Sequence, residues 1–315
     1  MDSKTKKQTS SAKGFASFSL NQIARLKKLG KPRTADKYTC ALNSFMRFRQ
    51  KREIPLREMN AHLMMEYEVY LKSAGLCPNT TSFYQRNLRA LYNRAVAQGL
   101  TVQRHPFKYV YTGIDKTPKR AVSLKEIRRI HDLPLASQSV LDWARDLFLF
   151  SFYTRGMSFV DMAFLKKKDL CNGVLSYRRR KTNQQLFIRW EKRMQAVVDK
   201  YDTGDSPYLL PIIRNSGGDE WRQYVNASHL LNKKLKLIGD EVGLSVPLTM
   251  YVARHGWASI AKSKNIPLSV ISEAMGHDSE KTTRIYLASL DTAHVDWANH
   301  VILNSLEMDS SLSKR

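Results

Sequence analysis

The stretch MGHDSEKTTRIYLAS, residues 275–289, joins a Gly-His pair to a Thr-Thr pair and a tyrosine that stands nine residues after the histidine. A tyrosine in a helical segment most often packs its ring into a hydrophobic core. Its hydroxyl can also attack phosphorus and hold the bond as a phosphotyrosine. The spacing between His277 and Tyr286 is compatible with both roles, so the residues upstream must decide between them.

The residues upstream supply side chains that suit phosphoryl transfer without a metal ion. A phosphodiester under attack gathers negative charge on its non-bridging oxygens, and arginine binds such oxygens through two parallel hydrogen bonds. A lysine at the tip of a hairpin can reach into a groove and protonate the leaving alkoxide. Of the two histidines nearby, His255 fits a structural role better than a catalytic one. The cations and proton-transfer groups are Arg155, Lys181, Arg254, His255, His277 and Tyr286.

The charge of the chain points to a polyanionic partner. Its 315 residues contain 52 Lys and Arg against 28 Asp and Glu, which gives a formal net charge of +24. This excess is larger than solubility requires, and it is spread along the chain instead of being gathered in a tail. Nucleic acid is the partner that such a charge favours. The side chains that we predict to contact DNA are Lys37, Arg86, Arg89, Arg178, Arg179 and Arg180.

Missing motifs exclude several other classes of protein. The sequence has no G-x-x-x-x-G-K-[ST] or G-x-G-x-x-G loop, so nucleotide binding has no support. It has no C-x-x-C or H-E-x-x-H pair, and its three cysteines are far apart, so neither a metal site nor a disulfide framework is predicted. No apolar run approaches the ~18 residues that span a bilayer, and the polar N-terminus is no signal peptide. We therefore expect a cytoplasmic protein with no cofactor and no metal.

The first half of the chain has the pattern of a small helical bundle. Apolar residues recur at helical spacing in four runs, which glycine and proline residues separate. Thr34, Asn60 and Thr80 are the predicted N-caps of the second, third and fourth helices. We therefore predict a flexible basic lead-in at residues 1–16 and a four-helix domain at residues 17–103.

A linker at residues 104–122, with two prolines, a glycine and several cations, precedes a second domain. Ser123 and Glu126 have the S-x-x-E spacing of a capping box, which predicts that a helix starts directly after the linker. We place the second domain at residues 123–290. The weakly amphipathic residues 291–315 form a C-terminal tail.

The second domain is predicted to be mainly helical, with a small β-hairpin or sheet. Residues 174–180 and 185–190 read as two strands, and residues 181–184 as the turn between them. This hairpin carries Lys181 at the end of a run of three arginines, so the run can also serve only to grip phosphates. The fold class is therefore α-rich, mixed α+β.

Three motifs in the second domain carry a specific resemblance. YVARHGWA at residues 251–258, MGH at 275–277 and TTRIY at 282–286 resemble the C-terminal signature of the tyrosine recombinases, the phage integrase family. That family shows H-x-x-R-H, then L-G-H, then a tyrosine nine residues after the last histidine. RRRKTNQQ in the hairpin and YTRGMSFVD before it resemble the blocks that carry the family's lysine and first arginine. The bundle resembles the family's core-binding domain, and the whole chain most resembles the integrase-type recombinases of Bacteroidetes.

The resemblance implies a role for each candidate side chain. Tyr286 attacks the scissile phosphate and leaves a 3′-phosphotyrosine. Arg155 and Arg254 hold the non-bridging oxygens. Lys181 protonates the leaving 5′ oxygen, and His277 hydrogen-bonds the phosphate.

Two positions depart from the family pattern. The family's first arginine stands two residues after a glycine, where this chain has Ser158, and the nearest arginine is Arg155. We assign the role to Arg155, because its long side chain can reach the phosphate from the preceding turn. Ser158 and Asp161 have the spacing of a helix N-cap pair, which gives the serine another function. Tyr251 replaces the first histidine of H-x-x-R, and its hydroxyl can hydrogen-bond the phosphate but is a poor general base, with a pKa of about 10.

The resemblance also implies the partners. These are duplex DNA with inverted-repeat core sites and a homotetramer on two such sites, with residues 291–315 as a possible helix that docks on a neighbouring copy. The protein would act at the nucleoid of a bacterial cytoplasm. Two other functions stay open: a DNA-binding relative that has lost catalysis, which Ser158 and Tyr251 favour, and a nicking-closing enzyme similar to type IB topoisomerases.

Overall fold

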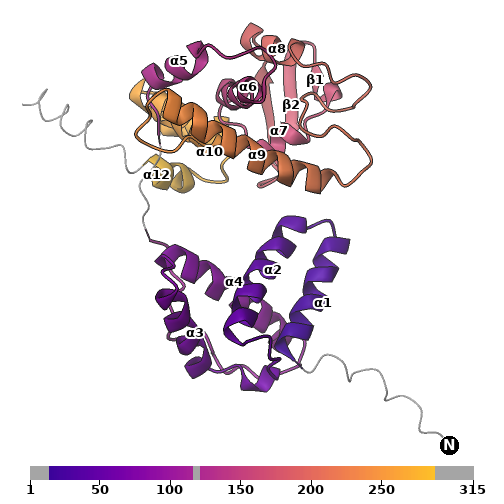
Figure 1. Cartoon of the computed structure of the whole chain (residues 1–315), viewed down its shortest axis with the longest axis vertical. Coiled ribbons are helices and arrows are strands. Elements are labelled where there is room, and N and C mark those ends of the chain that lie inside the picture. Colours follow the sequence, from indigo (N-terminus) through magenta and orange to yellow (C-terminus); the bar gives the residue numbers. More distant parts are fainter. Residues whose placement is uncertain (1–13, 116–120, 288–315) are drawn as a thin grey trace, which may run out of the picture. The chain divides into compact units, whose positions relative to one another are not determined.

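The computed structural model describes residues 14–115 and 121–287 of the chain. The chain forms two compact units, which divide after Thr117 (Figure 1). The predicted tail at residues 291–315 and residues 1–13 of the predicted lead-in lie outside the described residues. Within the described part, no helix is both long and apolar enough to cross a membrane.

The first unit is a bundle of four α-helices, as the sequence predicts. Aromatic rings fill its core: Phe45 lies edge-on to both Phe15 and Tyr67, with ring centroids 5.8 and 5.2 Å apart. All three rings are buried. The elements are α1 (Phe15–Lys28), α2 (Pro32–Phe48), a 3-10 turn (Leu56–Glu58), α3 (Ala61–Ser73) and α4 (Pro78–Ala97).

Two of the three predicted N-caps in this bundle are wrong. Asn60 caps α3 as predicted, since its side chain accepts a hydrogen bond of 3.0 Å from the backbone N–H three residues later. The other two helices begin at Pro32 and Pro78, ahead of Thr34 and Thr80. A proline in the first helical turn has no N–H to satisfy, and its φ is already near the helical value. Each helix therefore extends past the threonine to the proline.

Much of the segment predicted as a linker packs on the first unit. Phe107 and Val110 are buried in the core of the bundle. The Ser82 hydroxyl donates a hydrogen bond to the carbonyl of Gly113 at 2.5 Å. Residues as far as 115 thus belong to the first unit.

The second unit is mainly helical and contains a small antiparallel sheet. Its strand order is β1-β2-β3, and β2 and β3 are the predicted hairpin. The first strand was not predicted, because two residues are too few to show an alternating pattern. The capping box of Ser123 and Glu126 is confirmed at the start of α5. The strands are β1 (Leu170–Cys171), β2 (Val174–Arg178) and β3 (Gln185–Arg189).

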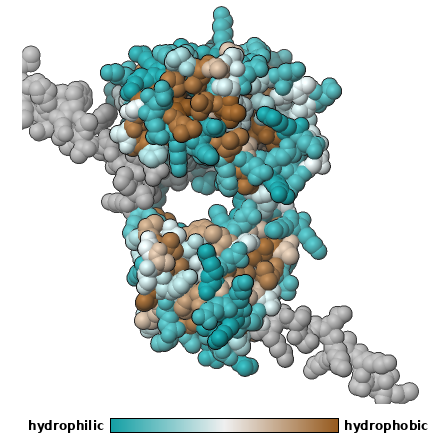
Figure 2. All heavy atoms as spheres, viewed as in Figure 1, coloured by the Kyte–Doolittle hydropathy of each residue, from teal (hydrophilic) through white to brown (hydrophobic). Residues whose placement is uncertain are grey.

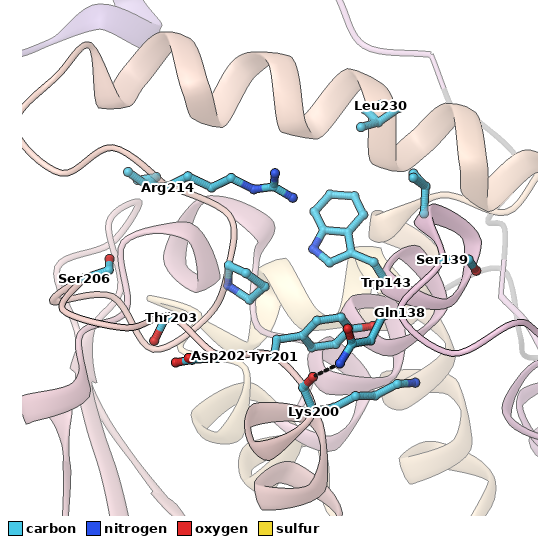
Figure 3. A pocket seen from close by; sticks show the side chains of 13 residues that line it. Gln138, Ser139, Trp143, Lys200, Tyr201, Asp202, Thr203, Ser206, Arg214 and Leu230 are labelled. Atoms are coloured by element: carbon cyan, nitrogen blue, oxygen red, sulfur yellow. Dashed lines mark hydrogen bonds between the residues drawn. The ribbon is translucent and has the colours of Figure 1, made fainter.

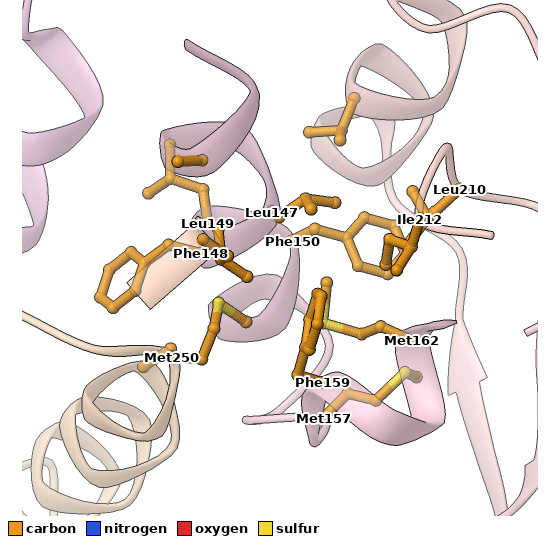
Figure 4. Packing of buried hydrophobic residues seen from close by; sticks show 14 of the residues in the cluster. Leu147, Phe148, Leu149, Phe150, Met157, Phe159, Met162, Leu210, Ile212 and Met250 are labelled. Carbon is orange, nitrogen blue, oxygen red and sulfur yellow. The ribbon is translucent and has the colours of Figure 1, made fainter. Parts of the chain in front are cut away.

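The helices α5, α8, α9 and α10 pack against α6, which is central to the core of the second unit. Residues 147–150 of α6 are buried, and Met157, Met162 and Met250 pack around them (Figure 4). A helix that is buried on most sides needs apolar residues all round, as the run LFLF provides. The helices are α5 (Leu124–Asp132), α6 (Val140–Tyr153), α7 (Phe159–Ala163), a 3-10 turn (Lys167–Asp169), α8 (Lys192–Asp199), α9 (Glu220–Glu241), α10 (Met250–Ser263), α11 (Leu268–Ala274) and α12 (Glu280–Leu287).

The face of the molecule in Figure 2 is mainly hydrophilic on both units, with hydrophobic residues gathered in patches between the polar ones. Lys37, Arg178 and Arg180 are among the exposed basic side chains of the chain.

The position of α6 in the core also fixes the turn at its C-terminal end, which lies near the candidate site. The turn that follows this helix, at residues 154–156, is held against α10, the helix that carries Arg254.

Candidate active site

Arg254 is a buried cation that connects three segments of the second unit. It projects from α10 and is only 5% exposed. One guanidinium nitrogen, Nη1, donates to the carbonyl of Gly156 at 2.8 Å, and the other, Nη2, donates to the carbonyl of Met275 at 2.5 Å. A buried charge is tolerated only when its donors are satisfied. These bonds therefore fix the turn after α6 and the turn after α11 to the same guanidinium.

Gly156 allows the turn after α6 to approach Arg254 so closely. Its φ is +74°, a conformation that side chains disfavour. A Cβ atom at this position would lie 2.7 Å from the Cα of Arg254. The residue before it, Arg155, also has a positive φ, of 60°. The backbone around Arg155 is therefore fixed by the packing of the adjacent Gly156 against Arg254 of α10.

The imidazole of His277 is held between Arg254 and a threonine of α12. Its Nε2 lies 3.0 Å from Nη2 of Arg254, and its Nδ1 lies 2.7 Å from Oγ1 of Thr283. A guanidinium can only donate, so Nε2 must accept, and the ring proton must lie on Nδ1 and be donated to Thr283. The geometry therefore assigns His277 as a neutral imidazole with a defined tautomer.

The electrostatic surroundings agree with that assignment. Burial, together with the positive charges of Arg254, Arg179 and Lys181, lowers the pKa of His277 to about 4. Protonation would place a cation directly against Arg254. The family resemblance implies that His277 hydrogen-bonds the phosphate. In this arrangement both ring nitrogens already have protein partners, and the ring orients Arg254.

The hairpin between β2 and β3 brings Lys181 to the same place. Lys181 is exposed, and its charge lies close enough to His277 to lower the pKa of that histidine. Two residues of the same turn bind the segment around His277: Thr182 Oγ1 donates to the carbonyl of Gly276 at 3.2 Å, and Gln184 Nε2 donates to the carbonyl of His277 at 3.2 Å. The structure thus unites Lys181, Arg254 and His277, which lie far apart in the sequence.

The turn after α6 brings Arg155 next to this cluster, because the carbonyl of Gly156 accepts a hydrogen bond from Arg254. Burial and the charge of Asp161 raise the pKa of the Tyr177 hydroxyl overall, while the charges of Arg254, Arg179 and Arg155 act to lower it. Arg155 itself is half-buried. Tyr177 itself was not predicted as part of the site, because an inward-facing strand tyrosine looks like any core residue.

Two protein-family models match the chain. The phage integrase SAM-like domain matches residues 14–111, and the phage integrase family matches residues 137–293. The chain belongs to the phage integrase family, the tyrosine recombinases. The first match lies in the first unit. The second lies in the second unit and includes Arg155, Lys181, Arg254 and His277.

Three similar proteins are also recombinases or integrases, which agrees with the family assignment. The tyrosine recombinase XerC of Leptospira interrogans is 21% identical over 287 residues, which cover 87% of this chain and 91% of that protein. A lambda integrase dimer bound to a COC′ core site has a TM-score of 0.63 at 16% identity, covering 86% of this chain and 94% of that one. The XerH recombinase in its post-cleavage complex with a palindromic difH substrate has a TM-score of 0.62 at 20% identity, covering 92% and 90%. At these identities the structures show a shared fold.

The position where the family's first arginine is expected holds Ser158 in this recombinase. Ser158 is the N-cap residue of α7, as predicted, but its hydroxyl does not bind a backbone N–H. It donates to the carboxylate of Asp161 at 2.5 Å, and the other oxygen of that carboxylate accepts from the backbone N–H of Arg180 at 2.9 Å. Ser158 therefore helps to anchor the start of the Lys181 turn.

The two tyrosines among the catalytic candidates lie on different helices. Tyr286 falls in α12, the helix that also carries Thr283, the partner of His277. Tyr251 lies in the first turn of α10 and is 59% exposed, with its ring edge-on to His255 at 4.6 Å between centroids. His255 is buried, which suits the structural role expected from the sequence.

The predicted DNA contacts divide into exposed and buried side chains. Lys37 and Arg178 are exposed, and Arg180 is exposed with its guanidinium 4.1 Å from the centroid of the Phe164 ring. Arg86 is half-buried, and half-buried Arg89 donates to the hydroxyl of Thr112 at 3.2 Å. Arg179 differs from the expectation, because it is buried and its Nη1 donates to the carbonyl of Gly276.

The second unit also contains a pocket that is separate from this cluster. It has a volume of about 530 Å³ and is lined by residues that include Trp143, Lys200 and Arg214 (Figure 3). Gln138 Nε2 donates to the carbonyl of Lys200 at 3.0 Å across one side of it. None of the catalytic candidates lines this pocket, so it has no part in the chemistry described here.

Among the described residues, no group of three or more His, Cys, Asp or Glu side chains could hold a metal ion.

The lowered pKa of His277 gives the first prediction. Between the ordinary value of 6.5 and about 4, the unfolded chain binds a proton at this histidine that the folded chain does not. Stability should therefore fall as the pH drops through that window. We expect the His277 imidazole to titrate near pH 4 by NMR. His277→Asn should lose this part of the pH dependence in thermal unfolding, and a wild-type midpoint near 6.5 would contradict the neutral assignment.

Proposed function

We propose that this recombinase cleaves and rejoins duplex DNA at specific sites through a 3′-phosphotyrosine on Tyr286. One observation carries the proposal: Arg254 and His277 are hydrogen-bonded to each other, and the segments that carry Arg155 and Lys181 converge on them. A phosphate at this cluster would meet several cations and one proton donor. Metal-free transfer of a phosphoryl group requires cations that stabilise the transition state and a donor that protonates the leaving oxygen.

Four of these residues then have a defined part in the cleavage step, and His277 orients Arg254. The Tyr286 hydroxyl gives its proton to solvent, and its oxygen forms a bond to phosphorus while the bond from phosphorus to the 5′ oxygen breaks. The ammonium of Lys181 gives a proton to the departing 5′ oxygen. Arg254 and Arg155 bind the non-bridging oxygens, where charge accumulates. In rejoining, a 5′-hydroxyl gives its proton to the neutral amine of Lys181 and attacks phosphorus, and the Tyr286 oxygen leaves and takes a proton from solvent. The energy of the original bond is thus conserved.

We propose the same partners that the sequence suggested. Lambda integrase has been captured as a dimer on a core site and as a tetramer on a Holliday junction, and that tetramer aligns with this chain at a TM-score of 0.59. For this chain the proposal is inverted-repeat core sites and a tetramer on two of them. The first unit, predicted at residues 17–103 but extending from residue 14 to residue 115 of the described chain, would form the core-binding domain. Residues 123–290 would form the catalytic domain, and residues 291–315 a segment that docks on a neighbour. The reaction would take place at the nucleoid, in the bacterial cytoplasm.

A nicked suicide substrate tests the cleavage reaction. After cleavage, the short fragment downstream of the scissile phosphate diffuses away and the protein stays bound to the 3′ end. We expect a covalent complex on a denaturing gel, with undiminished yield in excess EDTA, because the proposed step uses only side chains. Loss of the complex in EDTA and its return with magnesium would contradict the proposal.

The suicide substrate, together with a native gel, an assay of supercoil relaxation and an assay of recombination between two sites, separates the alternatives. Ser158 favours a relative that binds DNA without cleaving it, and such a protein would shift the substrate on a native gel yet give no covalent complex. A nicking-closing enzyme would give the complex and relax supercoiled DNA, but it would not exchange strands between two sites. A recombinant product from two sites therefore supports the recombinase over both alternatives.

A further inference from the structure

The hairpin that carries Lys181 grips the turn that carries His277 through three donors. Arg179 Nη1 and Thr182 Oγ1 both donate to the carbonyl of Gly276, the latter at 3.2 Å. Gln184 Nε2 donates to the next carbonyl, that of His277, at 3.2 Å. The donors come from both sides of Lys181, and the acceptors are consecutive. The tip of the hairpin is therefore fixed to the backbone at His277 itself.

Gly276 makes this close contact possible. Its φ is +61°, so a side chain would be strained there whatever the space. A Cβ atom would also lie 3.1 Å from Cδ of Arg179 and 3.2 Å from Oε1 of Gln184, within the range where neighbours must move. The hairpin and the turn thus pack with no room for a side chain between them.

Arg179 is an unusual member of the arginine run. Its neighbours Arg178 and Arg180 are exposed, whereas Arg179 is 5% exposed. No ion pair joins it to a carboxylate among the described residues, and its buried Nε has no hydrogen-bond partner. Burying a cation with only neutral acceptors is unfavourable for stability. A role in stabilising the fold alone therefore does not account for an arginine at this position.

We infer that Arg179 is a positioning residue for the chemistry: it holds the Lys181 hairpin against the His277 turn, so that the proton donor and the Arg254–His277 pair meet at one phosphate. This inference rests on the proposed function, in which Lys181 protonates the 5′ oxygen. It replaces the surface contact with DNA that the sequence suggested for Arg179. Thr182 and Gln184 assist, but only Arg179 places a charge in the contact.

The test compares two leaving groups. In one nicked substrate the leaving atom is the ordinary 5′ oxygen, and in the other a 5′ sulfur replaces it at the bridging position. A thiolate leaves without protonation, because a thiol has a pKa of only about 8.5. A variant that lacks the proton donor, or that misplaces it, should thus be slow with oxygen and recover with sulfur. A variant that has lost phosphate binding or its fold should be slow with both.

Three variants complete the design. Arg179→Met keeps most of the buried volume and removes the donors, Lys181→Ala removes the proton donor, and Arg189→Met changes an exposed arginine of the same hairpin. With the oxygen substrate we expect single-turnover cleavage about 10²-fold slower for Arg179→Met, in the range of general-acid effects. With the sulfur substrate we expect both Arg179→Met and Lys181→Ala to return to within a few-fold of wild type. Arg189→Met should match wild type with both substrates.

The outcomes separate this inference from the proposed function. If Lys181→Ala recovers with sulfur and Arg179→Met does not, Arg179 does not act through Lys181 and the inference is wrong. Full activity of Arg179→Met on the oxygen substrate would overturn it as well. If Lys181→Ala itself fails to recover, the role proposed for Lys181 falls, and this inference falls with it. Should Arg179→Met not fold, Arg179→Gln, which keeps a polar side chain and removes the charge, is measured on the same two substrates and judged by the same criteria.

Discussion

Replacing Tyr286 by phenylalanine should abolish the covalent complex with DNA and leave DNA binding unchanged. The substitution removes one oxygen atom, which in the proposed reaction is the nucleophile. Binding depends instead on many phosphate contacts, which the net charge of +24 supports and which this oxygen does not supply. A nicked suicide substrate on a denaturing gel measures the complex, and a native gel measures binding.

A matched control is available one motif upstream. Tyr251 is an exposed tyrosine on α10, and Tyr251→Phe removes the same atom from a residue that is not the proposed nucleophile. We expect Tyr251→Phe to keep forming the complex, with a reduced rate if its hydroxyl contacts the phosphate. A covalent band that persists in Tyr286→Phe but disappears in Tyr251→Phe would move the nucleophile to α10.

Much of the fold could be predicted from local patterns in the sequence. The four-helix bundle, the capping box at Ser123 and the hairpin before and after Lys181 all follow from periodicity and turn chemistry. The failures were also local in origin. Thr34 and Thr80 are good capping residues, but the prolines ahead of them start the helices earlier, and a two-residue strand leaves no pattern to detect.

The candidate site was only partly accessible to the same reasoning. The motifs around Arg254, His277 and Lys181 have specific spacings, and the structure does bring these three together. The residues next to a cation along the chain do not indicate whether its side chain is buried. Arg179 sits between two exposed arginines, and only the packing against Gly276 distinguishes it. The tautomer of His277 likewise depends on the hydroxyl of Thr283, which nothing in the sequence pattern marks as a partner of the histidine.

The electrostatics of the site follow from the same burial. Arg254 needs an acceptor at Nη2, and a neutral His277 provides one only if its pKa stays low. Burial of the ring lowers this pKa most, and the cations around the ring lower it further, because each disfavours the imidazolium form. The cations that would bind a phosphate therefore also help to set the protonation state of the histidine among them.

We propose that Arg155 takes the place of the family's first arginine. We expect Arg155→Ala to lower the rate of strand cleavage by about 10³-fold or more, by analogy with other arginines that stabilise a phosphoryl-transfer transition state. Folding should change little. The left-handed backbone at residue 155 is fixed by hydrogen bonds of the turn, from Arg155 N to Phe152 O at 3.2 Å and from Gly156 N to Ser151 O at 2.8 Å. Alanine adopts that conformation no more readily and no less readily than arginine.

Ser158→Ala is the matched comparison, since it alters the position where the family has its arginine. The serine hydroxyl donates to Asp161, which also holds the backbone of Arg180, so its loss should reduce stability by about 1–2 kcal/mol. The hydroxyl carries no charge, and its partner is a carboxylate of the protein, so cleavage should continue near the wild-type rate. Single-turnover rates on the suicide substrate, together with thermal unfolding, distinguish the two effects. An active Arg155→Ala beside an inactive Ser158→Ala would show that the serine, and not the arginine, serves the phosphate. An Arg155→Lys variant with an intermediate rate would add that the paired hydrogen bonds of the guanidinium matter beyond its charge, because lysine keeps only the charge.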